Sequence, residues 1–172
     1  VIAFCKLYLP TLSAGAFESP RARVVIADGA RFAKESSDRF DVIVVDSTDP
    51  QGPGAVLFTE EFYRDCRNLL KPGGIMATQC GNPSIFPDEL VFTQERQRNA
   101  GFASADYFFA AVPTYVGGNM ALGFASDDPG RRQVSAEVSR ARGVPPGLGW
   151  YTPEIHVAAF AHPAWMMARV GY

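Results

Sequence analysis

Two carboxylates three residues apart mark the part of the chain best suited to chemistry. Asp46 and Asp49 directly follow the apolar run 40–45, in the sequence Asp-Ser-Thr-Asp-Pro-Gln-Gly-Pro. The run predicts a strand buried on both faces, and open parallel sheets bind ligands beyond the carboxyl ends of such strands. Two prolines and a glycine within residues 50–53 prevent a regular continuation, so both acids are expected in a loop over the ligand. The pair favours a cation site; the alternative is that an aspartate caps the next helix or closes an Asx-turn.

The composition indicates one globular domain. Of the 172 residues, 47% are apolar and 20% are charged, which is enough for a core. A net charge of −2 and a pI of about 5.7 give no basic footprint for nucleic acid or for a membrane surface. No long apolar run or signal-peptide pattern occurs in the sequence. We therefore expect a cytoplasmic protein whose partner is a small molecule, with neither nucleic acid nor a membrane as partner.

Neither the cysteines nor the histidines show ligand spacing. Cys5, Cys66 and Cys80 contain no C-x-x-C pair, and His156 and His162 form no cluster with acids. Reduced, buried thiols and packing histidines are expected, with no disulfide and no metal site.

The positioning elements form a repeating pattern that ends in a hairpin. Strands are predicted over residues 23–27, 40–45 and 75–79, and helices over residues 1–10, 30–35, 59–70 and 87–96. Two more strands, 106–112 and 119–125, are joined by a short connection that suits an antiparallel hairpin. The fold class is thus α/β, with a mostly parallel sheet and a terminal antiparallel hairpin. We expect a single domain over residues 1–172: the sheet and its helices in 1–128, a connecting segment in 129–149 and C-terminal helices in 150–172.

Several segments together resemble the polyamine synthases, a family of aminopropyltransferases that includes the spermidine synthases. They are CKLYLP at 5–10, VIADG at 25–29, FDVIVVDSTDPQGP at 40–53, LFTEEFY at 57–63, PTYVGG at 113–118 and EIHVAAF at 154–160. The D-S-T-D-P-x-G-P and P-T-Y motifs are specific, whereas a strand followed by Asp-Gly occurs in many nucleoside-binding domains. The resemblance implies a Rossmann-like S-adenosylmethionine-dependent transferase sheet. It also implies aminopropyl transfer from decarboxylated S-adenosylmethionine, a co-substrate and no permanent cofactor, to a diamine such as putrescine, which gives spermidine and methylthioadenosine.

The resemblance also implies roles for individual residues. Asp46 matches the family's proton acceptor, which the reaction needs because an alkylammonium with a pKa of about 10.4 must lose a proton before it attacks. The diamine side comprises Asp46, Ser47, Thr48, Asp49, Gln79 and Tyr115. Asp28 and Gly29 match the pair that recognises adenine, and Pro53 matches a contact to the departing nucleoside. Taken alone, Tyr115 could equally be an exposed hairpin residue and Gln79 a strand-end hydrogen-bonding residue.

Some features of the family are expected to lie before Val1. They are a glycine-rich turn, an acid for the ribose hydroxyls and a small β-domain. Because these enzymes form dimers through that β-domain, we expect the full-length form to be a homo-oligomer. The family's sheet order is 3-2-1-4-5-7-6, and strands 3 to 7 remain here. The strand at 23–27 must then pair directly with the strand at 40–45 or lie at the edge with unpaired backbone groups. We expect the isolated chain to be poorly stable and to bind methylthioadenosine weakly.

Two other functions stay open at this point. A methyltransferase of the same topology would use intact S-adenosylmethionine, and an acidic pair facing the donor's carboxylate argues against it. A non-catalytic relative that serves in binding or assembly is the second alternative. The missing glycine turn supports that alternative, and the presence of Asp46, Asp49 and Tyr115 argues against it.

Overall fold

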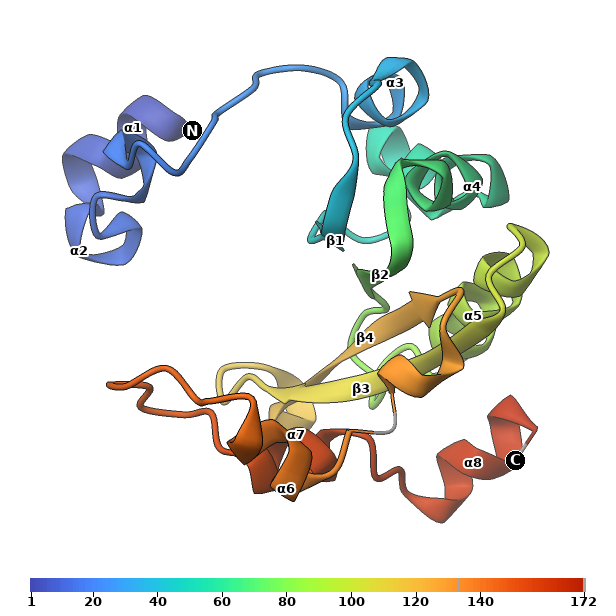
Figure 1. The fold of residues 1–172 in the computed structure, drawn as a ribbon. Helices are drawn as coiled ribbons and strands as arrows, with labels where there is room; N and C mark the ends of the chain where they lie inside the picture. The colour runs from blue at the N-terminus through green and yellow to red at the C-terminus, as the bar shows by residue number, and fades with distance from the viewer. Residues whose placement is uncertain (133, 172) are drawn as a thin grey trace.

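A mixed β-sheet forms the centre of the molecule (Figure 1). The computed structural model describes residues 1–132 and 134–171; Gln133 of the predicted connecting segment and Tyr172 of the predicted C-terminal helices lie outside the described residues. The strands of this described part are β1 (Phe40–Val45), β2 (Leu70–Gln79), β3 (Ser104–Ala111) and β4 (Asn119–Ser126).

The strand order is β1-β2-β4-β3. Strand β2 is parallel to β1, and β4 is antiparallel to both β2 and β3. Within the described sheet, β1, β2 and β3 therefore run in one direction and β4 runs in the other. This arrangement confirms the α/β class and the antiparallel hairpin, and it follows the order 4-5-7-6 that the resemblance implies.

Short helices and turns connect and cover the strands. The α-helices are α1 (Ile2–Tyr8), α2 (Pro10–Ser13), α3 (Gly29–Glu35), α4 (Glu60–Leu69), α5 (Asp88–Asn99), α6 (Ala136–Ala141), α7 (Pro153–Ala159) and α8 (Ala164–Val170). The 3-10 turns are η1 (Ala16–Glu18), η2 (Gly52–Phe58), η3 (Val116–Gly118) and η4 (Pro129–Arg131). Side-chain oxygens of Thr59, Ser135 and Thr152 accept backbone N–H groups and so begin α4, α6 and α7. Across the described residues, no helix has both the length and the apolar character needed to cross a lipid bilayer.

Helices cover both faces of the sheet. Met76 of β2 packs in a cluster with Tyr63 and Cys66 of α4. On the opposite face, Phe160 at the end of α7 contacts the rings of Phe108 and Phe124. Side chains along a strand alternate between faces, so one strand supplies both layers of the core.

The strand predicted over residues 23–27 does not form. The segment is extended but has no ladder partner in the described sheet, and Val24, Val25 and Ile26 are 47, 51 and 88% exposed. The expected pairing with β1 is wrong, whereas the unpaired backbone agrees with the other expected outcome, since Arg23, Val25 and Ala27 line a pocket with Phe40 of β1. A strand needs a ladder partner for its backbone groups, and this segment has none, although an ion pair of 3.0 Å joins Arg23 to Asp38 just before β1. Figure 1 shows the segment as a long connection that leaves α1 and α2 apart from the sheet.

Candidate active site

The pairing of the strands brings three segments to one edge of the sheet. Strands β1 and β2 pair as far as Val45 and Thr78, so Asp46 and Gln79 stand at neighbouring carboxyl ends. Strand β4 pairs with Gln79 close to its own start. The hairpin tip at residues 112–118 therefore lies at the same edge, where open α/β sheets hold their ligands.

A pocket of about 580 Å³ lies at this edge. Its lining includes every residue predicted for the diamine side, from all three segments: Asp46, Ser47, Thr48, Asp49, Gln79 and Tyr115. The rest of the lining is Gly81, Asn82, Ile85, Phe86, Thr114, Val116 and Met120. Carboxylates beside apolar walls suit an elongated cation with methylene groups, since the charges and the apolar carbons each find a partner.

The loop that carries the two acids is packed closely against η2. A Cβ atom on Gly54 would lie 2.5 Å from Thr48 Oγ1 and 3.5 Å from the Asp49 carbonyl oxygen, so a larger residue there would force the Thr48 side chain to shift. The helix that follows is capped by Thr59, and η2 has no side-chain cap. Helix capping therefore does not account for Asp46 or Asp49, whose side chains are exposed at the pocket.

Gln79 holds the same loop in place through hydrogen bonds from its side chain. Its side chain is buried at the end of β2, and Nε2 donates to the Ser47 carbonyl oxygen at 3.3 Å and to Asp49 Oδ1 at 3.5 Å. Gln79 is thus a strand-end hydrogen-bonding residue and a pocket residue at once.

Tyr115 stands on the hairpin tip and is 48% exposed. Its backbone N–H donates to the Val112 carbonyl at 2.9 Å, and its carbonyl accepts from Gly118 at 2.8 Å. Gly117 and Gly118 have φ values of 78° and 71°, a backbone conformation that favours glycine. The glycine pair after Tyr115 therefore lets the chain turn back into β4 while the phenol stays at the pocket.

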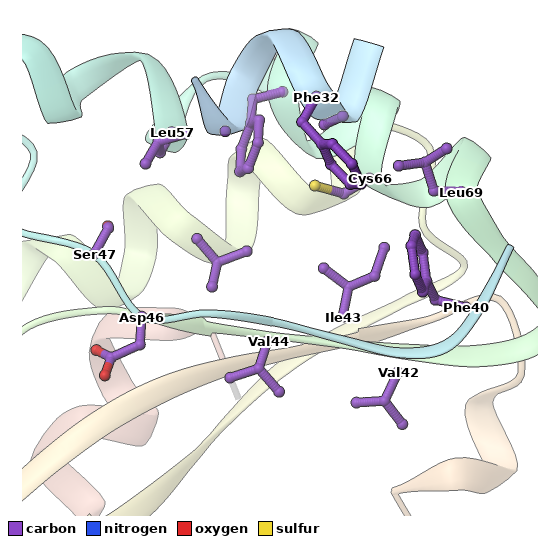
Figure 2. A pocket seen from close by; sticks show the side chains of 14 residues that line it. Phe32, Phe40, Val42, Ile43, Val44, Asp46, Ser47, Leu57, Cys66 and Leu69 are labelled. Carbon is purple, nitrogen blue, oxygen red and sulfur yellow. The ribbon is translucent and has the colours of Figure 1, made fainter. Parts of the chain in front are cut away.

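A second, apolar pocket of about 360 Å³ lies beside β1 (Figure 2). Figure 2 shows the side chains of Phe32, Ile43 and Cys66 facing one another between the helices and the strand, with Asp46 at the strand end. Asp46 and Ser47 line both pockets. In Figure 2 the Asp46 side chain leaves the strand on the same side as Val42 and Val44, so its carboxylate points away from the apolar pocket.

The residues predicted for the nucleoside side are not in the first pocket. Asp28 caps α3, with Oδ1 accepting from the Arg31 N–H at 2.9 Å. Gly29 lines the apolar pocket. Pro53 is exposed in η2 and is not part of the lining of either pocket. The structure thus brings Gly29 into one pocket with Asp46 and Ser47, but it places neither Asp28 nor Pro53 in the lining of either pocket.

Sequence reasoning missed Asn82 and the apolar side of the first pocket, formed by Ile85, Phe86 and Met120. Asn82 follows the third predicted strand, as Asp46 follows the second. Its position after the carboxyl end of a strand was the one signal in the sequence that could have indicated a site residue. In the described part of the chain, no three His, Cys, Asp or Glu side chains gather as ligands for a metal ion.

Comparison with known proteins adds independent information. The model of the family described as "Spermine/spermidine synthase domain" matches residues 1–135. The polyamine aminopropyltransferase of Ruegeria sp. (strain TM1040) is 49% identical over 168 residues, which cover 96% of this chain and 59% of that protein. Polyamine aminopropyltransferase 1 of Pseudomonas aeruginosa is 43% identical, covering 99% of this chain and 60% of that protein.

Solved structures agree with the sequence relatives. A spermidine synthase in complex with the transition state analogue AdoDATO superposes with a TM-score of 0.87 at 34% identity, over 99% of this chain and 57% of that one. The spermidine synthase of Thermotoga maritima gives a TM-score of 0.84, also at 34% identity, over 99% of this chain and 56% of that one. The chain spans about 60% of the length of the curated relatives named above. On the family match, the sequence identity and the shared fold, this chain belongs to the spermine/spermidine synthase family.

Proposed function

We propose that the full-length protein transfers an aminopropyl group from decarboxylated S-adenosylmethionine to putrescine, giving spermidine and methylthioadenosine. The observation that carries this proposal is that Asp46, Asp49, Gln79 and Tyr115 line one pocket. A spermidine synthase of similar fold binds a transition state analogue. The sequence relatives are named polyamine aminopropyltransferases, which supports aminopropyl transfer.

The pocket chemistry suits a diamine. At neutral pH both amines of putrescine are protonated, and the Asp46 and Asp49 carboxylates can pair with ammonium groups. Ser47 and Thr48 offer hydroxyl and carbonyl oxygens to the same groups. Ile85, Phe86 and Met120 offer apolar contacts to the methylene chain. The volume of about 580 Å³ falls in the range of small-molecule sites.

The transfer then needs one proton to leave the attacking amine. Asp46 accepts that proton, and the freed nitrogen lone pair attacks the carbon bonded to the sulfonium sulfur. The carbon–sulfur bond breaks, its electrons go to sulfur, and neutral methylthioadenosine leaves. A carboxylate is a weak base for an amine, so placement and removal of water must contribute. Tyr115 orients the nitrogen through its hydroxyl, and Asp49 holds the cation.

The donor occupies the other side of Asp46 in this proposal. Asp28 uses one carboxylate oxygen for the cap of α3, which leaves the second to accept from the exocyclic amine of adenine. The Gly29 N–H donates to a ring nitrogen, and Pro53 contacts the departing nucleoside. Support comes from the shared lining: Asp46 and Ser47 belong to both pockets, so the two pockets adjoin at the carboxyl end of β1.

The remaining assignments concern the protein as a whole. We infer that residues 1–172 are part of a single catalytic domain, that the full-length protein forms a homo-oligomer and that it acts in the cytoplasm. Size-exclusion chromatography with light scattering tests the oligomer directly.

A product assay on the full-length protein tests the function. Putrescine and decarboxylated S-adenosylmethionine should give equal amounts of spermidine and methylthioadenosine by mass spectrometry. Intact S-adenosylmethionine should give no methylated product. Formation of S-adenosylhomocysteine with intact donor would favour a methyltransferase, and absence of any product would favour the non-catalytic alternative.

A further inference from the structure

Asn82 joins two segments that face each other across the first pocket. Its side-chain Nδ2 donates to the Val116 carbonyl oxygen at 2.6 Å, so the segment after β2 is bonded to the residue next to Tyr115. Both Asn82 and Val116 line the pocket. This contact crosses between elements, whereas Asn119 Nδ2, 3.2 Å from the Gly117 carbonyl, bonds within the hairpin itself.

Asn82 is itself held firmly. Its Oδ1 accepts from the Ser84 N–H at 2.9 Å, and its carbonyl accepts from Ile85 and Phe86 at 3.0 and 2.8 Å. Its side chain is half-buried at the pocket wall. The donor group of Asn82 is therefore fixed in space before it meets the hairpin, and little entropy is lost in forming the bond.

The hairpin tip is also packed against the same segment. A Cβ atom on Gly117 would collide with Ser84 Oγ, so the tip approaches as closely as a glycine allows. The backbone hydrogen bonds of Tyr115 stay within the tip. The position of the phenol relative to Asp46 and Asp49 thus depends on what holds the tip to the segment after β2.

We propose that Asn82 is a positioning residue that holds Tyr115 over the two acids. This inference rests on the proposed aminopropyl transfer and adds a residue to it. The amide of Asn82 need not touch either substrate. It fixes the backbone of Val116, and through it the ring of Tyr115, at the place where the attacking nitrogen must be oriented.

The test uses the full-length protein and three variants. Asn82→Ala removes the donor, and Asn82→Asp keeps the acceptor for Ser84 but cannot donate to Val116. Asn119→Ala is the matched control, because it removes an amide from the same hairpin outside the pocket lining. For both Asn82 variants, kcat/KM for putrescine should fall about tenfold or more, with the KM for the donor unchanged, because misplacement by an ångström costs up to about a hundredfold. Asn119→Ala should stay within about twofold of wild type, as expected for a surface change without a catalytic effect.

A double-mutant cycle then shows whether Asn82 acts through Tyr115. In the Tyr115→Phe background, Asn82→Ala should have little further effect on kcat/KM, because residues acting as a unit are not additive. Fully additive losses would overturn the proposal, since they would mean an effect on the fold alone. A loss in Asn119→Ala equal to that in Asn82→Ala would overturn it as well.

A measurement without turnover separates the two proposals. Hydrogen exchange of the peptide covering residues 113–119 should speed up in Asn82→Ala and stay unchanged in the segment 60–69. If the wild-type protein transfers no aminopropyl group, the proposed function fails, and the exchange result still shows whether Asn82 holds the tip. Unchanged exchange at the tip would overturn the inference even in an active enzyme.

Discussion

Gln79 hydrogen-bonds to the loop that carries both acids, with Nε2 at 3.5 Å from Asp49 Oδ1. Its Oε1 accepts the N–H of Gly81, and the side chain is only 3% exposed. One buried amide therefore ties together the end of β2, the segment that follows it and the acidic loop. The loop sequence alone, rich in proline and glycine, defines no single position for Asp49; the bond from Gln79 supplies it.

Removal of this amide should loosen the acidic loop. We expect Gln79→Ala to lower kcat/KM for the diamine about tenfold or more in the full-length protein, because the acids lose their alignment with the acceptor. The stability loss should be about 1–3 kcal/mol, the cost of leaving buried polar groups unpaired. Steady-state kinetics and denaturant titration measure the two effects. Gln51→Ala, an exposed change in the same loop, is the control, and an equal loss in that variant would contradict this role of Gln79.

Gly123 of β4 should tolerate no side chain. A Cβ atom there would lie 2.7 Å from Gln97 Nε2, 3.0 Å from Thr93 Cγ2 and 3.1 Å from Thr78 Cγ2. All three neighbours are buried, so Gly123→Ala should lower the free energy of unfolding by about 1–3 kcal/mol through overpacking.

Gly149 offers the matched control for that change. A Cβ atom on Gly149 meets nothing within 4 Å, so Gly149→Ala should change the free energy of unfolding by less than about 0.5 kcal/mol. Urea titrations of both variants compare the two sites. If the two substitutions changed the free energy of unfolding equally, the side chains of Gln97, Thr93 and Thr78 would have to shift without cost to accommodate the added Cβ atom.

Stability should fall in alkaline solution because three buried groups resist ionisation. Burial raises the pKa of the Cys66 and Cys80 thiols to about 12, and burial raises the pKa of Tyr63 to about 12 as well. Unfolding exposes these groups, and their pKa values then return to about 8.5 for cysteine and 10 for tyrosine. The folded state therefore binds more protons between pH about 8.5 and 12, so its stability is complete below that window and is lost as the pH rises through it.

Denaturant titrations from pH 8 to 11 measure this loss, whose slope is at most about 1.4 kcal/mol per pH unit for each group. Cys66→Ala should reduce the slope, because it removes one of the three buried groups. A flat profile in the unmodified protein would show that these groups ionise equally well in the folded state.

The sequence predicted the parts of the fold that local patterns determine. The apolar run 40–45 and the short connection at 113–118 are local signals, and β1 and the hairpin of β3 and β4 lie where they predicted them. The segment 23–27 has an equally strong β-branched run, yet it forms no strand, because strand formation depends on a partner that no local pattern contains.

The prediction of the candidate site was limited in the same way, because contacts between distant segments leave no local pattern. Asp46 and Tyr115 were predicted to act together, and the register of β1, β2 and β4 brings their segments to one pocket. Asn82 was missed because its bond to Val116 spans 34 positions of the chain and depends on where the hairpin tip comes to rest. Contacts of that kind follow from tertiary packing and leave no spacing in the sequence.

Replacement of Asp46 tests the central claim most directly. Asp46→Asn keeps the size of the side chain and removes the base; in the full-length protein it should lower kcat by about a hundredfold or more, as expected for loss of a general base. Binding of methylthioadenosine should stay within about twofold. The control is Asp41→Asn, an exposed carboxylate on the same strand that pairs with Lys71 at 2.8 Å, and it should retain wild-type turnover. Wild-type turnover by Asp46→Asn would contradict the proposal that this carboxylate takes the proton from the diamine.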